Sequence, residues 1–321
     1  MAAIHLIHEN PAWLPPFAAA LDGRGLPWRD WDLSAGTFDL SAPPPHGVFY
    51  SRMSASSHTR GHASAPALTA AVLSWLERHG RRVINGTRAL DLEVSKARQY
   101  AALEAAGLTV PRTVAVTGDA TAIAAAAEQH FGGGPVILKP NRGGKGLGVR
   151  LLADSTALAA LLAELPAEEA PVDGLWLLQA HIRAPRPMIT RAEFVGGRFL
   201  YAVEVDTSDG FELCPADVCA IGDAACPAEA PAPKFRVVDP DDTALIRRIE
   251  SFLAANGIEI AGVEFIRDAS GCAFVYDVNT NTNYNPDAEA AAGIAGTDRS
   301  GPGSVAAFLG RELAGWQRAA A

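Results

Sequence analysis

VILKPNRGGKGLGV, residues 136–149, joins a short apolar run that ends in Lys139 to a loop with four glycines in six positions. The apolar run predicts a strand, and residues 149–152 predict a return strand. Because glycine has no Cβ, the backbone N–H groups of such a loop can approach an anion closely. The pattern favours a phosphate-binding flap, and a plain surface hairpin is the alternative. The candidate phosphate-binding residues are Lys139, Gly143, Gly144, Lys145, Gly146 and Gly148.

The glycine-rich nucleotide motifs of other folds fit this segment less well. The sequence contains no G-x-x-x-x-G-K-[ST], which excludes a Walker loop, and no G-x-G-x-x-G that opens a helix. In protein kinases the glycine loop precedes the strand lysine, whereas Lys139 comes before its glycines. We therefore expect a phosphate flap of a different architecture.

More than a hundred residues further along the chain, the sequence predicts a hairpin with polar oxygen ligands on both strands. Residues 262–267 and 274–279 have strand composition, and turn-forming residues lie between them. The first strand carries Glu264, and the second carries Asp277 and Asn279.

The register of this hairpin decides whether its acids meet. With Arg267 opposite Phe274, Glu264 lies directly opposite Asp277, and Asn279 points to the same face as Asp277. Facing carboxylates repel each other, and a divalent cation between them would remove this penalty. Since carboxylate and amide oxygens are the ligands that Mg²⁺ prefers, we predict a metal site here. A solvent-facing acidic edge is the alternative.

The rest of the chain alternates between helical and strand patterns, which predicts an α+β protein with a small open α/β unit at its start. We expect this N-terminal domain to cover residues 1–94, with strands near 4–8, 48–50 and 83–84 and helices near 11–21 and 65–79. The remainder, 95–321, is expected to contain a lid subdomain at about 110–180 and a C-terminal metal-binding subdomain at about 181–310.

Local signals mark several boundaries within the second part. Ser95 is a suitable N-cap for a helix over 96–106, and Gly107 is a suitable stop for it. The alanine-rich stretches at 121–130 and 156–165 also predict helices. The segment 222–233, rich in Ala, Pro and Gly, predicts a surface loop.

Composition limits the classes of partner. Hydrophobic residues make up 49% of the chain and charged residues 20%, as in ordinary globular proteins. The formal net charge of −9 argues against a nucleic-acid partner. No apolar run is long enough to span a bilayer, and the start of the chain lacks the pattern of a signal peptide, so no membrane partner is expected.

The spacing of the cysteines bears on the compartment in which the protein is found. Their spacings differ from the short C-x2-C pairs of structural zinc sites, so we favour free thiols in a reducing environment over a zinc site. With no signal peptide expected, this predicts a cytoplasmic location. The four cysteines are Cys214, Cys219, Cys226 and Cys272.

Together these features resemble the ATP-grasp superfamily, and most of all its branch of RimK-type glutamate ligases and glutathione synthetases. The resemblance covers about residues 83–310 and includes the lysine strand, the glycine flap and the acidic hairpin. A further matching segment comes before them and consists of Ser95, Lys96, Leu103, Gly107, Pro111 and Thr113. The resemblance implies the ATP-grasp fold, in which two α+β subdomains grip ATP, preceded by a small open α/β domain.

The resemblance also implies roles for individual residues. Lys96 and Lys139 would contact the phosphates of ATP, and Arg191 and Arg236 would act as catalytic residues at the reacting phosphate. The metal ligands would be the oxygen groups of the hairpin, holding Mg²⁺ with Mn²⁺ as a substitute. The adenine would be held by a strand and hinge with Gln179, Ala180, His181 and Ile182.

The function implied is that of an ATP-dependent ligase that joins a carboxylate to an amine through an acylphosphate. The acid would be a small molecule or a peptide, and the amine an amino acid; a homo-oligomer is compatible with the sequence. An ATP-grasp kinase that phosphorylates a hydroxyl and a non-catalytic nucleotide-binding regulator are the alternatives.

Two polar segments are candidates for binding the substrates. The first follows an expected strand and combines basic and hydroxyl groups that suit a carboxylate or a phosphate. The second continues past the predicted metal ligands. Each has an alternative as a solvated loop whose side chains satisfy its own backbone. The candidate residues are Arg52, Ser54, His58 and Arg60 in the first segment and Asn281 and Asn283 in the second.

Overall fold

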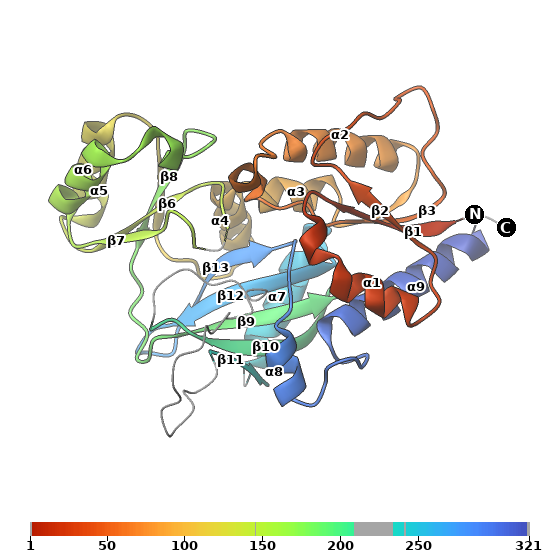
Figure 1. Ribbon diagram of the computed structural model, residues 1–321. Coiled ribbons are helices and arrows are strands. Elements are labelled where there is room, and N and C mark those ends of the chain that lie inside the picture. Colours follow the sequence, from red (N-terminus) through yellow and green to blue (C-terminus); the bar gives the residue numbers. More distant parts are fainter. Residues whose placement is uncertain (1, 145, 209–233, 241, 320–321) are drawn as a thin grey trace, which may run out of the picture.

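The computed structural model describes residues 2–144, 146–208, 234–240 and 242–319. Within these ranges the strands form three sheets, which Figure 1 shows as separate parts of the molecule. Helices and strands follow one another along the whole described chain. The α+β class predicted from the sequence is therefore confirmed.

The first sheet is parallel and is built by the N-terminal part of the chain. Helix α2 (Ala65–Arg78) packs on one of its faces, where Leu73 and Leu76 are fully buried. The order of the strands is β2 (Trp28–Asp32), β1 (Ala3–His8), β3 (Gly47–Ser51) and β4 (Arg82–Ile84).

Strand β2 has no counterpart among the expected strands. Its sequence, WRDWD, lies at the edge of the sheet, and none of its residues is buried. An edge strand of this kind needs no apolar face, so it lacks the alternation by which strands are recognised.

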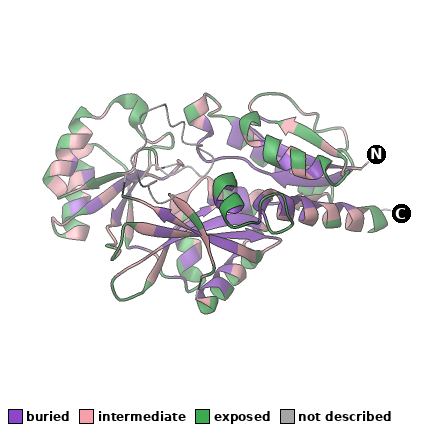
Figure 2. Cartoon of the chain, turned by 60° about the horizontal axis from the view of Figure 1, so that its bottom comes forward, coloured by how far each residue is buried: buried purple, intermediate pink, exposed green. Residues whose placement is uncertain are grey.

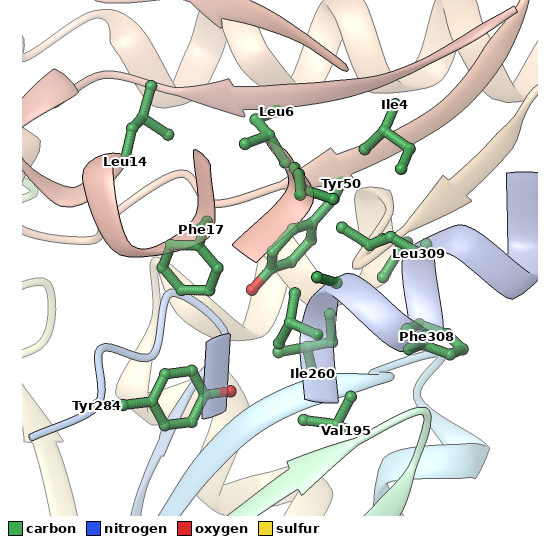
Figure 3. Close-up of a cluster of buried hydrophobic side chains, with 14 of the residues drawn as sticks. Ile4, Leu6, Leu14, Phe17, Tyr50, Val195, Ile260, Tyr284, Phe308 and Leu309 are labelled. Atoms are coloured by element: carbon green, nitrogen blue, oxygen red, sulfur yellow. The ribbon is translucent and has the colours of Figure 1, made fainter. Parts of the chain in front are cut away.

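Helix α9 (Gly301–Ala319) covers the other face of the first sheet together with α1 (Pro15–Asp22). Its Leu309 shares one hydrophobic cluster with Ile4 of the first sheet and Ile260 of the second (Figure 3). This helix therefore packs between two parts of the molecule that the sequence predicts as separate domains.

The second sheet is antiparallel and contains the acidic hairpin. One hydrophobic cluster joins a face of this sheet to α7 (Thr243–Ala255), α3 (Thr87–Glu93) and α4 (Lys96–Ala105). The short helix α8 (Pro286–Ala291) follows the hairpin in the chain. The order of the strands is β11 (Phe235–Val238), β10 (Arg198–Asp206), β9 (Met188–Val195), β12 (Ile260–Arg267) and β13 (Ala273–Asn279).

The third sheet is antiparallel and carries the strand that ends near Lys139. Helices α5 (Ala120–Phe131) and α6 (Ser155–Glu164) pack on it, and Figure 2 shows that much of their surface is exposed. The order of the strands is β5 (Thr113–Val116), β8 (Trp176–Ala180), β6 (Val136–Pro140) and β7 (Arg150–Leu152).

The predicted start and end of helix α4 are marked by the expected residues. The Ser95 side chain accepts a hydrogen bond from the Arg98 N–H, and Gly107 follows the helix with φ +75°. Short 3₁₀ helices complete the described elements at Pro11–Trp13, Ser57–Arg60 and Ala167–Glu169.

Glu264 and Asp277 face each other as predicted, but the register of the hairpin strands differs from the predicted one. Arg267 lies opposite Ala273 rather than Phe274, so that premise is wrong. The pairing shifts by one residue between Phe265 and Glu264, which leaves Tyr276 as a bulge in β13. Because a β-bulge inserts one extra residue, Glu264 still lies opposite Asp277.

Two further expectations concern compartment and thiols. No helix within the described ranges is long and apolar enough to cross a membrane. Cys272 is a free, exposed thiol. The other three cysteines and the segment 222–233 lie outside the described residues, so their predicted states stay predictions.

Candidate active site

One cavity of about 590 Å³ is lined by residues from the second and third sheets and from loops of the N-terminal part. Most of the predicted site residues line it. They are Ser54, Lys96, Lys139, Gly143, Gly144, Gly146, Gln179, Ala180, His181, Ile182, Arg191, Glu264, Asp277, Asn279, Asn281 and Asn283. Lys145, which was also predicted, lies outside the described residues.

Lys96 enters this cavity from the first turn of α4. Its Nζ donates to Asp277 Oδ1 on β13. Burial opposes both charges, yet the attraction between the two groups raises the pKa of Lys96 above its ordinary value and lowers that of Asp277. The pair therefore links the helix to the acidic hairpin as an ammonium and a carboxylate.

Lys139 enters the same cavity from the third sheet and is only 5% exposed. Burial, reinforced by the nearby charge of Lys96, lowers its pKa to about 7. Its Nζ donates to the hydroxyl of Tyr100 on α4. This lysine thus combines a buried position with a neutral partner, which leaves its charge available to an anion.

The predicted metal ligands share one face of the hairpin. Burial and the charge of Asp277 raise the pKa of Glu264, although Arg191 counteracts this. The Asn279 amide lies 3.5 Å from Glu264 Oε1. Within the described ranges no three His, Cys, Asp or Glu side chains form a metal-binding group. Two carboxylates and one amide oxygen nevertheless fit Mg²⁺, which commonly takes its other ligands from water and phosphates.

Arg191 lies at the centre of a buried network on β9. Its Nε donates to Glu193 Oε1 at 2.6 Å, and its Nη1 donates to Glu264 Oε1 at 2.7 Å. Its Nη2 donates to Thr282 Oγ1 at 2.6 Å, and Thr282 donates in turn to Glu193. Burial disfavours the charge, but the two carboxylates raise the pKa of Arg191 above its ordinary value. The guanidinium is therefore fixed in position.

Gly262 provides the space for this guanidinium. A Cβ at Gly262 would lie 2.4 Å from Arg191 Nη2 and 2.7 Å from Cζ. We expect Gly262→Ala to displace Arg191 and to lower the free energy of unfolding by about 1–3 kcal/mol, the usual cost of overpacking. Urea unfolding measures this change. Gly134→Ala is the matched control, because its Cβ would meet only ordinary contacts; equal stability of the two variants would contradict the prediction.

The cavity also has apolar lining residues. Strand β8 supplies Gln179, whose Nε2 donates to Thr113 Oγ1 at 2.8 Å, and the hinge residues that follow. Burial lowers the pKa of His181 in this hinge. The apolar side chains of Ile137, Leu147, Ile189 and Ile266 also line the cavity. Such a surface suits a flat aromatic ring.

Arg236 is the clearest correction. It does not line the cavity, its side chain is 62% exposed, and it pairs with Glu204. Glu204 lies opposite Thr190, so Arg236 and Arg191 project from opposite faces of the sheet. The resemblance implied a catalytic role for Arg236 at the reacting phosphate, but in this arrangement its side chain does not reach the cavity.

Three of the predicted substrate residues, Arg52, His58 and Arg60, also do not line the cavity. Arg52 is 1% exposed, and it donates to the carbonyl oxygens of Trp13 and Thr282 and to the Asn283 side chain. Its position supports the loop that carries Asn283 instead of contacting a ligand.

His58, Arg60 and Gly148 likewise do not line the cavity. Arg60 forms a two-pronged ion pair with Glu9, at 2.5 and 3.2 Å, and its guanidinium lies over the Trp13 ring. Gly148 has φ +74° and packs against Pro140. Arginines with this many internal partners have a structural role that sequence alone does not reveal.

The sequence analysis missed several residues of the site. Trp13, Ser56 and Glu93 line the cavity, and Tyr100 and Glu193 hold two of its basic residues, Lys139 and Arg191. None of them belongs to a motif. The sequence offered one weak signal. Glu193 comes two residues after Arg191, so on a strand the two side chains point to the same face of the sheet.

The glycine flap is connected to the N-terminal part of the chain. Arg142, at its base, donates to the carbonyl oxygen of Ala55 at 3.2 Å and to Ser57 Oγ at 3.2 Å. The Asn141 side chain accepts from the Ala97 N–H at 2.8 Å, which joins the flap to the start of α4. These contacts place the flap against the same cavity as the two lysines.

Searches of protein-family models and of curated proteins return no match for this sequence. Solved structures do resemble it. A RimK domain ATP-grasp protein from Sphaerobacter thermophilus superposes with a TM-score of 0.66 at 18% identity, covering 96% of this chain and 99% of that one. D-alanine–D-alanine ligase from Bacillus anthracis gives 0.65 at 14% identity and covers 100% of both chains.

A third structure contains ligands. The ATP-grasp ligase PsnB, in complex with a phosphomimetic variant of a minimal precursor, Mg and ADP, gives a TM-score of 0.63 at 17% identity. The match covers 97% of this chain and 99% of PsnB. At such identities the likeness establishes the fold and leaves the reaction to be argued from the site. The chain therefore has the ATP-grasp fold.

Proposed function

We propose that this protein is an ATP-dependent ligase that joins a carboxylate to an amine through an acylphosphate. The observation that carries this proposal is that Lys139, Asp277 and the glycine flap share one cavity, although they come from distant parts of the sequence. The cavity also has apolar side chains suited to packing against adenine. The PsnB complex with Mg and ADP supports the choice of nucleotide and metal.

The basic residues and the flap would position the phosphates. Lys96, Lys139 and the backbone N–H groups of the flap supply positive charge and donors within a site that partly excludes water. Glu264, Asp277 and Asn279 would hold Mg²⁺, or Mn²⁺ in its place, and the ion when bound would neutralise negative charge on the phosphates. Arg191 stays held by Glu193 and can face the reacting groups.

The reaction would proceed in two displacements. A carboxylate oxygen of the acid attacks the γ-phosphorus, the bond to the β-phosphate oxygen breaks, and ADP leaves. The amine nitrogen then attacks the acyl carbon, phosphate leaves, and the amine loses a proton. The protein contributes mainly orientation and charge stabilisation, as in other phosphoryl transfers.

The substrates are proposed by class. The similar structures include a ligase of D-alanine with D-alanine and a ligase bound to a precursor peptide. We therefore propose a small-molecule or peptide acid and an amino-acid amine. The end of the cavity with Ser54, Asn281 and Asn283 offers hydroxyl and amide groups for recognising them.

A screen for ADP release tests this function. Candidate acids and amines are supplied in pools with MgATP, and hydroxylamine is added to trap an acylphosphate. Acid-dependent hydroxamate formation is the expected result. A stable phosphate ester instead would indicate a kinase, and binding of nucleotide without any release of ADP would indicate a regulator.

The affinity for nucleotide should depend on pH through Lys139. Its pKa is about 7, and bound phosphates should raise it, so binding takes up a proton above pH 7. Affinity therefore falls as the pH rises from 7 to 9, by at most about tenfold per pH unit. Titration calorimetry with the ATP analogue AMPPNP in buffers of different ionisation enthalpy measures this uptake. Lys139→Met removes the contribution; identical pH slopes for both proteins would contradict the assignment.

A further inference from the structure

Tyr100 lies on α4, behind the phosphate end of the cavity, and is 4% exposed. Its hydroxyl donates to the backbone carbonyl of Tyr276 at 2.7 Å. A phenol has one proton, so this bond commits the donor and leaves the oxygen lone pairs as acceptors. Any further hydrogen bond at this hydroxyl must therefore be one that its oxygen accepts from a nearby donor.

Lys139 is that donor. Its Nζ bonds to the Tyr100 oxygen and lies 5.0 Å from the centroid of the same ring, within the range of a cation–π interaction. No carboxylate of the described residues lies within ion-pair distance of Lys139. Lys96, in the same cavity, is by contrast paired with Asp277. Lys139 is thus held by a neutral hydroxyl, whereas Lys96 is held by a carboxylate.

This difference has a consequence for an anionic ligand. A phosphate that approaches a salt-bridged lysine competes with a carboxylate, which both attracts the lysine and repels the ligand. A phosphate that approaches Lys139 meets a neutral oxygen as the direct partner of the lysine, and Asp277 and Glu264 attract this lysine only from beyond ion-pair distance. A hydroxyl and a ring therefore fix the position of the Lys139 amine without placing a carboxylate between it and an anion.

The partner carbonyl lies at the bulge of the acidic hairpin. The bulge leaves Tyr276 outside the pairing with β12, so its carbonyl oxygen is free to accept from Tyr100. Tyr276 directly precedes Asp277. One buried chain of contacts thus runs from Lys139 through Tyr100 to the strand of the predicted metal ligands.

We propose that Tyr100 is a positioning residue for the nucleotide, which holds the Lys139 ammonium in place without neutralising it. The proposal rests on the function proposed above, because it assumes that a nucleotide phosphate occupies this end of the cavity. Tyr100 acts through Lys139 and has no contact of its own with the cavity.

Tyr100→Phe tests this role, since it removes the hydroxyl and keeps the ring. We expect the affinity for MgAMPPNP, measured by calorimetry, to fall about tenfold, the usual effect of losing a hydrogen bond to a charged group. In the Lys139→Met background the same change should alter the affinity by less than about twofold, because the lysine through which Tyr100 acts is gone.

Tyr201→Phe is the matched control. Tyr201 is 5% exposed, and its hydroxyl donates to Glu289 at 2.7 Å, away from the cavity. This variant should show a comparable change in urea unfolding with unchanged affinity for MgAMPPNP. Should Tyr100→Phe lose affinity equally with and without Lys139, or not at all, the inference is overturned.

Two further readouts separate this inference from the proposed function. Wild-type protein that fails to bind MgAMPPNP would overturn the function itself, and the inference with it. In the ADP-release assay the Tyr100→Phe variant should raise the KM for ATP about tenfold with a smaller change in kcat. A general structural defect would instead lower the fraction of active protein and hence the apparent kcat.

Discussion

Asp277→Asn is expected to reduce the rate of ADP release by at least about 10²–10³-fold, the usual effect of removing one preorganised charge contact. The substitution keeps the shape of the side chain and removes the charge that pairs with Lys96 and faces Glu264. An amide is also a weaker ligand for Mg²⁺ than a carboxylate. The Mg²⁺ concentration needed for half-maximal activity should therefore rise as the rate falls.

The control for this variant lies in the same hairpin. Asp268→Asn makes the same chemical change in the turn, where Asp268 accepts hydrogen bonds from Ser270 and Cys272 and does not line the main cavity. It should keep near-normal activity. Urea unfolding of both variants checks that the fold is kept. Near-normal turnover in folded Asp277→Asn would remove the basis for the metal site.

Lys139→Met is expected to lower kcat/KM for ATP by at least about 10²-fold, because it removes an ammonium aimed at the phosphates. Its effect on stability should have the opposite sign. Burial lowers the pKa of Lys139 to about 7, so the folded state disfavours the charged form that the unfolded chain carries up to its ordinary pKa. Replacing this lysine with an apolar side chain of similar length should leave the free energy of unfolding at pH 7–8 unchanged or higher.

A lower kcat/KM together with unchanged or higher stability would rule out a simple loss of fold. Lys234→Met is the control, because Lys234 lies next to β11 and does not line the cavity. Activity is measured as ADP release and stability by urea unfolding at pH 7 and 8. A Lys139→Met variant that is less stable and fully active would contradict both parts of the prediction.

The local elements of the site could be predicted because their signals lie in neighbouring residues. The strand before Lys139, the glycine loop and the return strand need only side-chain periodicity and the conformational freedom of glycine. The pairing of Glu264 with Asp277 was also predicted, although Arg267 does not face Phe274. A bulge at Tyr276 compensated for that error, and nothing in the sequence marks it.

The sequence by itself thus determined the α+β class, the glycine-rich loop after Lys139 and the pairing of Glu264 with Asp277, since each depends on contacts within a short stretch of chain. The tertiary structure alone decided which charged groups reach the cavity. Arg236 turned to the opposite face, Arg52 became buried beneath a loop, and Tyr100 met Lys139. The physical reason is that a side chain's direction follows from strand register and from packing between distant segments, which local patterns do not encode.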